Sequence, residues 1–230
     1  MEQDKQKVTY FLAQIGHEIR TPLNGIKGFG DLLLEETFGP LNEKQKLYLG
    51  KMLKNSDQLL AIVNQILDWA KLDSGQMILQ QETVNLNHVL RETASLVELR
   101  IQEKKLTLEV EVPQEPLLVQ GDYGRIREVI LNLVSNALKF TEPGGKICLI
   151  ARNEANERII QVKDNGVGIA PDYREKMFQP FSRGVDRPGE EKSVGLGLWI
   201  CKSLMELHQG TIEVESEEGQ GTTFTLKFRG

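Results

Sequence analysis

The stretch IGHEIRTPLNGI, residues 15–26, places a histidine, an acid and an arginine inside a pattern that is otherwise apolar and helical. The apolar residues around it recur every seven positions. With Leu12 at position a, the a series is Leu12, Ile19, Ile26 and Leu33, and the d series is Val8, Ile15, Pro22 and Phe29. Such a heptad predicts one long helix with a continuous packing seam.

In this register His17 falls at position f, which is farthest from the seam. A histidine on a helix is more often structural than functional, but this position favours a solvent-facing imidazole with Glu18 and Thr21 nearby. Pro22 removes the hydrogen bond to the carbonyl of Glu18 and predicts a local kink. An exposed histidine beside a bend is compatible with a reactive site.

A second helix is expected after the turn FGPLN, residues 38–42, with Asn42 as its N-cap and its end near Leu72. Its apolar stripe comprises Leu49, Met52, Leu59, Val63 and Ile66, widened by Leu53, Leu60 and Leu67. One partner helix cannot cover so broad a stripe. Two hairpins packed as a four-helix bundle would cover it, so the sequence predicts a homodimer.

Composition sets limits on the class of protein. A chain of 230 residues with 40% hydrophobic content predicts one or two domains with real cores. The net charge of −5 argues against recruitment to nucleic acid or to an acidic membrane surface. Cys148 and Cys201 have no zinc-like spacing and are expected to be buried reduced thiols. No apolar run reaches the ~18 residues of a membrane span, and no signal peptide is apparent, so we expect a cytoplasmic location.

Beyond residue 73 the heptad stops. We predict three segments: a helical domain at 1–73, a polar linker at 74–81 and an α/β domain at 82–230. Strands are expected at Met77–Leu79, Leu106–Val112, Leu117–Val119, Ile147–Ala151, Ile159–Val162, Thr211–Glu215 and Thr222–Phe228. Helices are expected at Leu86–Lys104, Gly124–Lys139 and Gly197–Leu207. One sheet covered on one face by three helices, a two-layer α/β sandwich, is the economical arrangement.

The stretch EVILNLVSNALKF, residues 128–140, carries one polar helical face. Glu128, Asn132, Asn136 and Lys139 recur at spacings of four, four and three. This face is either simply solvated or a binding surface. Solvated faces favour Glu and Lys over two amides one turn apart, and amide oxygens suit a Mg²⁺ ion that keeps waters and phosphates as its main ligands.

Two further stretches contain glycine motifs. In IIQVKDNGVGIA, residues 159–170, Asp164 follows an apolar strand and precedes Gly166 and Gly168. The motif is either a plain turn or a site where the carboxylate accepts a hydrogen bond from adenine. In SVGLGLWICKSL, residues 193–204, Gly195 and Gly197 open an amphipathic helix whose free N–H groups could bind an anion. Neither a dinucleotide fingerprint nor a GxxxxGK[ST] phosphate loop is present.

Two segments are read less directly. EGQGTTF, residues 218–224, is a hairpin turn when taken alone. FSRGVDRPGEEKSVG, residues 181–195, is either a disordered loop or a mobile lid. Phe178 and Phe181 either anchor the base of that lid or belong to the core.

Together and in this order, these stretches resemble the sensor histidine kinases of two-component signalling. HEIRTP at 17–22 is similar to the phospho-acceptor box of the family, and residues 128–140 are similar to its N box. DNGVG at 164–168, GLGL at 195–198 and GQGTT at 219–223 resemble its glycine boxes, and FQPF at 178–181 its phenylalanine box. The resemblance covers nearly the whole chain.

The resemblance implies a dimerisation and phosphotransfer domain followed by an ATP-binding domain of the gyrase, chaperone and kinase type. It implies that Asn132 and Asn136 hold Mg²⁺, that Lys139 contacts phosphate and that Asp164 reads adenine. The remaining nucleotide contacts that it implies are Phe140, Gly166, Gly168, Phe181, Gly195, Gly197, Leu198 and Thr222. The chain would then be a cytoplasmic segment, compatible with a membrane-anchored full-length sensor.

For the helical domain, the resemblance implies that His17 attacks the γ-phosphate of ATP and passes the phosphoryl group to an aspartate of a separate response regulator. Glu18 would act as the orienting base, and Thr21 would serve dephosphorylation of the regulator. One departure is Gly16, because a small polar residue, often serine, usually precedes the histidine in the family.

Two other classes of protein are alternatives to a histidine kinase. ATPases of the gyrase and mismatch-repair type carry a glutamate one turn before the magnesium-binding asparagine, where this chain has Asn132. An amide is a poor general base, which favours transfer over hydrolysis. A non-catalytic scaffold would need a broken ATP motif, and none of the motifs is broken.

Overall fold

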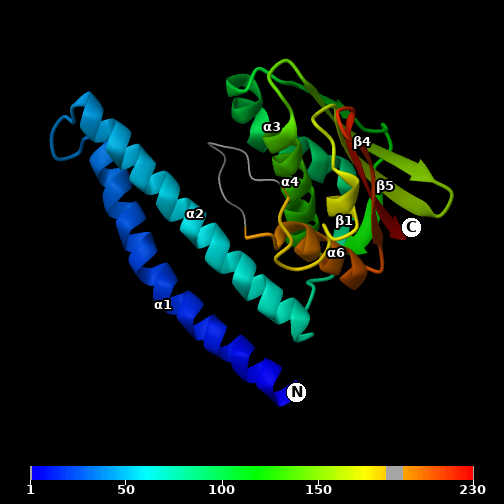
Figure 1. The fold of residues 1–230 in the computed structure, drawn as a ribbon, viewed down its shortest axis with the longest axis horizontal. Coiled ribbons are helices and arrows are strands. Elements are labelled where there is room, and N and C mark those ends of the chain that lie inside the picture. Colours follow the sequence, from blue (N-terminus) through cyan, green and yellow to red (C-terminus); the bar gives the residue numbers. More distant parts are fainter. Residues whose placement is uncertain (1, 185–193, 230) are drawn as a thin grey trace. The chain divides into compact units, whose positions relative to one another are not determined.

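The computed structural model describes residues 2–184 and 194–229. The chain divides into two compact units, Met1–Met77 and Ile78–Gly230 (Figure 1). The division falls inside the segment 74–81 that the sequence predicts as a linker. Among the described residues, none of the helices combines the length and the hydropathy that crossing a membrane requires.

The first unit is a helical hairpin of α1 (Glu2–Leu34) and α2 (Glu43–Asp73) (Figure 1). Helix α1 continues through Pro22 without a break. Asn42 caps α2 as predicted: its side chain accepts from the backbone N–H of Gln45 at 2.9 Å, and the Gln45 side chain accepts from the N–H of Asn42 at 2.9 Å. This reciprocal capping box explains where α2 begins.

The seam between α1 and α2 differs from the predicted one. The buried residues of α1 are Thr9, Gly16, Leu23 and Gly30. They also recur every seven residues, but each lies one position after the predicted d series. A Cβ atom at Gly16 would overlap the Leu67 side chain, so the glycine lets that leucine pack directly on the α1 backbone.

The second half of the predicted heptad face is left exposed in the single chain, whereas Ile15 and Ile19 are half-buried. Ile26, Phe29 and Leu33 are 47%, 73% and 41% exposed. Met52 and Leu59 of α2 also remain exposed. Pairing of α1 with α2 thus uses the small-residue face of α1, and the wider apolar surface is available for a second partner.

The second unit is a two-layer α/β sandwich, which confirms the predicted fold class. The main helices are α3 (Leu86–Glu103), α4 (Tyr123–Phe140) and α6 (Gly197–Leu207), with a short α5 (Pro171–Arg174). The strands are β1 (Glu82–Asn85), β2 (Thr107–Glu111), β3 (Leu118–Gly121), β4 (Lys146–Glu154), β5 (Glu157–Asp164), β6 (Thr211–Glu217) and β7 (Gly221–Arg229).

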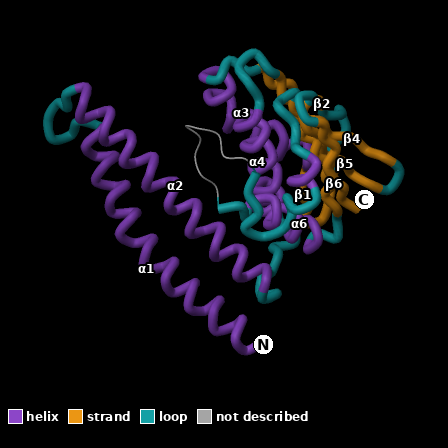
Figure 2. The backbone as a smooth tube through the Cα atoms, viewed as in Figure 1, coloured by secondary structure: helices purple, strands orange, loops and turns teal. Residues whose placement is uncertain are grey.

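The larger sheet has the order β2-β4-β5-β7-β6, antiparallel except for the parallel pair β2–β4. Helices α3, α4 and α6 cover one face of it (Figure 2). Alternate residues of β4 and β5, such as Leu149 and Ile160, are buried toward the helices, and Ile130 and Leu133 of α4 are buried against them. The opposite face of α4, which carries Asn132 and Asn136, is only half-buried.

Three predictions are wrong in detail. Met77–Leu79 is not a strand, since Ile78 is 86% exposed and the first strand begins at Glu82, where Val84 provides the buried side chain. The single sheet is also wrong, because β1 and β3 pair with each other in a separate two-stranded sheet. Cys201 is buried as expected, whereas Cys148 is only half-buried because it alternates with Ile147 and Leu149, which face the core.

Candidate functional site

The polar face of α4 forms as the spacing predicts. Asn132 and Asn136 are both half-buried, and the side-chain N–H of Asn136 donates to the amide oxygen of Asn132 at 3.4 Å. The two amide groups therefore lie together, and amide oxygens fit a hard cation that draws its other ligands from phosphates and water. Within residues 2–184 and 194–229, no three His, Cys, Asp or Glu side chains come together to hold a metal ion. The donor set therefore suits Mg²⁺ that arrives with a nucleotide.

Helix α6 begins directly against this face. A Cβ atom at Gly197 would lie 2.7 Å from the side-chain nitrogen of Asn132, so only glycine allows such a close approach. The N-cap residue, Leu196, gives no side-chain hydrogen bond to the first turn. The first N–H groups of a helix have no partner within the helix, so this end of α6 is a candidate anion site beside Asn132.

Asp164 ends β5 and is only 7% exposed. Its carboxylate accepts from the backbone N–H of Gly166 at 2.9 Å. Burial raises the pKa of this carboxyl above its usual range, and backbone hydrogen bonds from Gly166 and Thr222 partly oppose that rise. A buried carboxylate held by two backbone donors at a strand end is the kind of group that recognises a ligand donor.

Two of the three glycine motifs, DNGVG at 164–168 and GQGTT at 219–223, lie side by side. Gly168 has a φ of +69°, and a side chain there would overlap the carbonyl of Glu217. The N–H of Gly219 donates to the carbonyl of Val167 at 2.7 Å. Residues 164–168 and the hairpin at 217–221 therefore form one continuous wall.

Ser216 belongs to this wall and was missed in the sequence. Its hydroxyl oxygen accepts from the N–H of Ile169 at 2.9 Å and lies 2.9 Å from the hydroxyl of Thr222. It also donates to the carbonyl of Gly221 at 2.9 Å. Alternation with Ile212 and Val214 places a serine on the inward side of β6, and this is the signal that could have identified it.

The structure also places four other predicted nucleotide contacts: Lys139, Phe140, Leu198 and Phe181. The ammonium of Lys139 lies 5.0 Å from the ring centroid of Phe140, at the C-terminal end of α4. The carbonyl of Phe140 accepts from the N–H of Val167 at 3.2 Å. Leu198 is half-buried in the first turn of α6, and Phe181 is exposed with a φ of +60°. Residues 185–193 of the predicted lid lie outside the described residues.

His17 is exposed on α1, as predicted, although it directly follows Gly16 of the observed seam. The Thr21 hydroxyl donates to the carbonyl of His17 at 3.2 Å, and the side-chain N–H of Gln14 donates to the Glu18 carboxylate at 3.5 Å. On the other side of the helix, Arg20 donates to the side-chain oxygen of Asn64 on α2 at 2.9 Å. These contacts hold the neighbours of the histidine and leave its ring facing solvent.

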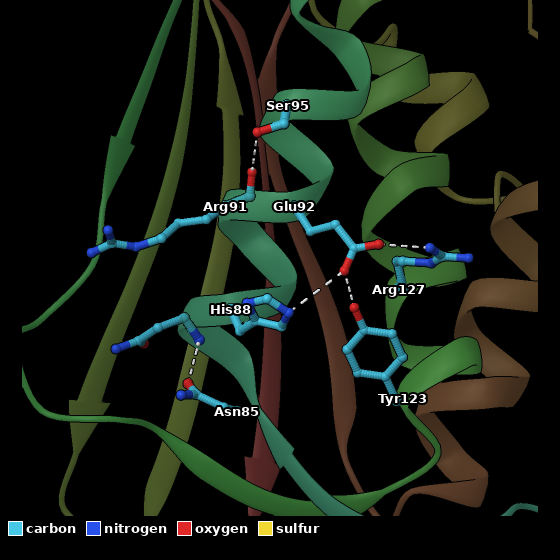
Figure 3. Close-up of polar contacts among 8 residues, drawn as sticks. Asn85, His88, Arg91, Glu92, Ser95, Tyr123 and Arg127 are labelled. Carbon is cyan, nitrogen blue, oxygen red and sulfur yellow. Dashed lines mark hydrogen bonds and ion pairs between the residues drawn. The ribbon is translucent and has the colours of Figure 1, made fainter.

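A second polar cluster joins α3 to α4, and none of its residues is among the predicted nucleotide contacts. Glu92 accepts from the Tyr123 hydroxyl and from Arg127 at 2.7 Å, and His88 lies 3.9 Å away (Figure 3). Arg127 and Asn132 are five residues apart, so they lie on different sides of α4. The cluster fixes the N-terminal end of the helix that carries the asparagines.

Comparison with known proteins gives two family matches in order. A family model described as His Kinase A (phospho-acceptor) domain matches residues 7–75. A second, described as histidine kinase-, DNA gyrase B- and HSP90-like ATPase, matches residues 121–230. His17 lies within the first match, and Asn132, Asn136 and Asp164 lie within the second.

Individual relatives agree with these matches. The non-motile and phage-resistance protein of Caulobacter vibrioides is 37% identical over 227 residues, which cover 95% of this chain and 27% of the relative. The circadian input-output histidine kinase CikA of Synechococcus elongatus is 36% identical over 94% of this chain and 29% of its own length. The chain thus spans little more than a quarter of these curated relatives.

Solved structures show the same family. Full-length ShkA in complex with AMPPNP is 34% identical with a TM-score of 0.77, covering 95% of this chain and 45% of ShkA. The catalytic domain of histidine kinase ThkA is 32% identical with a TM-score of 0.58, covering 65% of this chain and 95% of that domain. With both family models matched in order and a kinase catalytic domain covered almost completely, the chain belongs to the sensor histidine kinases and carries their phospho-acceptor and ATP-binding domains.

Proposed function

We propose that this chain transfers the γ-phosphoryl group of ATP to His17 and then to an aspartate of a separate response regulator. The observation that carries the proposal is that a single unit holds three groups suited to binding a nucleotide. Asn132, the N-terminus of α6 at Gly197 and the buried Asp164 all belong to this unit. The exposed His17 of the other unit is the matching acceptor.

In the proposed site, one group of residues binds the adenine and another binds the phosphates. Asp164 accepts from the adenine amino group, and Thr222, Gly166 and Gly168 form the wall around the base. Lys139 and the first turn of α6, with Gly195, Gly197 and Leu198, bind the phosphates, while Phe140 and Phe181 flank the site. Asn136 and Asn132 would hold Mg²⁺, which would neutralise phosphate charge when bound.

At the acceptor, a ring nitrogen of His17 attacks the γ-phosphorus. A nitrogen–phosphorus bond forms, the bond from phosphorus to the β,γ-bridging oxygen breaks and ADP leaves with that oxygen. The proton on the other ring nitrogen passes to Glu18, whose carboxylate Gln14 holds from the preceding turn. The phosphoryl group then moves from nitrogen to a carboxylate oxygen of the regulator.

Replacement of His17 tests this proposal. His17→Ala should bind ADP as the unaltered protein does and incorporate no label from ATP, because the two functions lie in separate units. The label on unaltered protein should be lost in acid and kept in alkali, as expected for a phosphoramidate. His88→Ala is the matched control, since His88 is an exposed histidine of the ATP-binding unit. Label that survives acid, or that persists in His17→Ala, contradicts the assignment.

Dephosphorylation of the regulator is a second part of the proposal and rests on Thr21. Its hydroxyl lies one turn after His17 on the same exposed face, where it could hold a water molecule against a docked phospho-aspartate. Thr21→Ala should keep autophosphorylation and lose regulator dephosphorylation, whereas Thr21→Ser should keep both. A parallel loss of both activities in Thr21→Ala would mean that Thr21 only supports the helix beside Pro22.

The partners follow from the same reading. A second copy of the chain would cover the exposed apolar face of the hairpin, giving a homodimeric four-helix bundle. The receiver domain of the regulator would dock beside His17, and neither nucleic acid nor membrane contact by this segment is required. In this proposal residues 1–73 form the phosphotransfer domain, 74–81 the linker and 82–230 the ATP-binding domain, all in the cytoplasm.

A further inference from the structure

His208 is a buried histidine that the proposed chemistry does not use. It is the C-cap residue of α6, and its Nδ1 lies 2.7 Å from the carbonyl oxygen of Leu204. The backbone N–H of Asp122 donates to its Nε2 at 3.0 Å. A carbonyl only accepts, so Nδ1 carries the hydrogen and Nε2 is the acceptor. Both ring nitrogens are therefore engaged, and one tautomer is fixed.

The partner of His208 is the N-cap of α4. One carboxylate oxygen of Asp122 accepts from the N–H of Arg125 at 3.0 Å, which caps the helix, and the other accepts from the N–H of Gln80 at 2.9 Å. A Cβ atom at Gly121 would lie 2.6 Å from the His208 ring, so glycine allows the ring to reach the backbone. The end of α6 is thereby joined to the start of α4 and to the segment that enters this unit.

Three contacts define how α6 lies along α4. His208 meets Asp122, the buried thiol of Cys201 lies 3.9 Å from the carbonyl of Val129, and Gly197 abuts Asn132. Positions increase along α4 as they decrease along α6, which is an antiparallel register. The eleven residues of α6 span about 16 Å. His208 therefore fixes the C-terminal end of a helix whose N-terminal end, at Gly197, faces Asn132.

We propose that His208 is a positioning residue: its bond to the N-cap of α4 sets the register of α6, and this register keeps the first turn of α6 opposite Asn132. The inference rests on the proposed function only in that this first turn binds nucleotide phosphate. His208 itself touches neither nucleotide nor the reacting atoms.

Two amide substitutions separate the bonds that His208 makes. The terminal amide of glutamine reaches the place of Nε2, so His208→Gln keeps an acceptor for the N–H of Asp122. The amide of asparagine reaches only the place of Nδ1, so His208→Asn keeps the donor to Leu204 and leaves the N–H of Asp122 unpaired. Replacing Asp122 is less informative because its side chain also caps α4.

The experiment compares these variants in the full chain. We measure ADP affinity with Mg²⁺ by calorimetry, KM for ATP and kcat for autophosphorylation, and, without nucleotide, hydrogen exchange of residues 200–204, where the hydrogen-bonded N–H groups of α6 begin. His208→Asn should weaken ADP binding and raise KM by about three- to thirty-fold and speed exchange of residues 200–204. His208→Gln should stay within about twofold of the unaltered protein, a change below the resolution of such coupling.

Val97→Ala is the matched control for loss of stability alone. Val97 is buried in α3, which packs on α4 and the sheet, so its truncation should lower the melting temperature and leave ADP affinity unchanged. Equal ADP affinity and equal exchange in His208→Asn and His208→Gln overturn the inference. If the unaltered protein does not bind ADP, the proposed function fails, while the exchange of residues 200–204 still decides the register.

Discussion

Asp164, which we propose as the residue that binds adenine, carries a cost to the stability of the fold. Burial raises the pKa of its carboxyl, so the folded unit binds this proton more tightly than the unfolded chain does. The contribution of the group to the free energy of unfolding is therefore present below the ordinary pKa of aspartate and is lost as the pH rises through the raised value. At neutral pH the ionised side chain works against folding.

Asp164→Asn should therefore raise the free energy of unfolding of the ATP-binding unit at pH 7, and the gain should shrink as the pH falls toward about 4, the ordinary value for aspartate. Urea unfolding across this pH range measures the difference. Asp172→Asn, an exposed aspartate of α5, is the control and should show no such trend. An Asp164→Asn variant less stable than the unaltered protein at pH 7 would refute the reasoning.

The proposed binding of adenine by Asp164 leads to a separate prediction. Asp164→Ala loses a hydrogen bond to a charged acceptor, which costs about 1.5–3 kcal/mol, or roughly ten- to a hundredfold in ADP affinity. Asn136→Ala should instead lose affinity mainly when Mg²⁺ is present. Calorimetry with and without Mg²⁺ separates the two, and equal losses without the metal would contradict the assigned roles.

Gly16 departs from the family pattern beside His17, the proposed phospho-acceptor. Alanine in a helix interior gains about 1 kcal/mol over glycine, but overpacking a full interface costs about 1–3 kcal/mol. Gly25→Ala, which meets nothing within 4 Å, should raise the melting temperature of the helical unit. Gly16→Ala, which would overlap Leu67, should not raise it unless Leu67→Ala is added. Equal stabilisation by the two single alanines would show that the contact at Gly16 is not tight.

At the scale of elements, Glu92 links α3 to α4. The Tyr123 hydroxyl, followed by Arg127, lowers the pKa of the Glu92 carboxyl, and the same hydrogen bond raises the pKa of Tyr123 (Figure 3). A lowered carboxyl pKa contributes stability that is present above the ordinary pKa of glutamate and is lost as the pH falls through the lowered value.

Glu92→Ala should therefore lower the melting temperature of the ATP-binding unit at pH 7, with a smaller difference below about pH 4.3. Thermal unfolding followed by circular dichroism at several pH values tests this. Glu98→Ala removes an exposed carboxylate from the same helix and should have little effect. A Glu92→Ala difference that stays constant with pH would assign the loss to packing instead of charge.

At the scale of the whole molecule, the chain consists of two units with different ways of hiding apolar surface. The ATP-binding unit buries its core between helices and sheet, whereas the hairpin leaves Phe29, Met52 and Leu59 exposed. The second copy that we propose for the four-helix bundle would cover this face.

Calorimetric scanning should therefore show two transitions that respond to different variables. Raising the protein concentration should raise the transition of the hairpin, because association stabilises the folded state by mass action, and ADP with Mg²⁺ should raise only that of the ATP-binding unit. Phe29→Asp should remove the concentration dependence and yield monomers in sedimentation. A monomeric unaltered chain at micromolar concentration would exclude the homodimer.

Much of the fold was predictable because its signals are local. The spacing of apolar residues, the capping residue Asn42 and the glycine before Leu198 each act within about one helical turn, and they located α2, α4 and α6 closely. The same local spacing placed Asn132 and Asn136 on one face and His17 in solvent.

Contacts between distant segments were decided by the tertiary structure alone. The seam of α1 uses Gly16 because Leu67, fifty-one positions later, packs onto bare backbone. The strand at Leu118–Gly121 leaves the main sheet because Glu82–Asn85 is available to pair with it. His208 reaches Asp122 only because α6 lies antiparallel on α4. The sequence by itself determined which faces and caps each segment offers, and only packing decided which of them meet, because that choice depends on shape and distance between segments rather than on spacing within one.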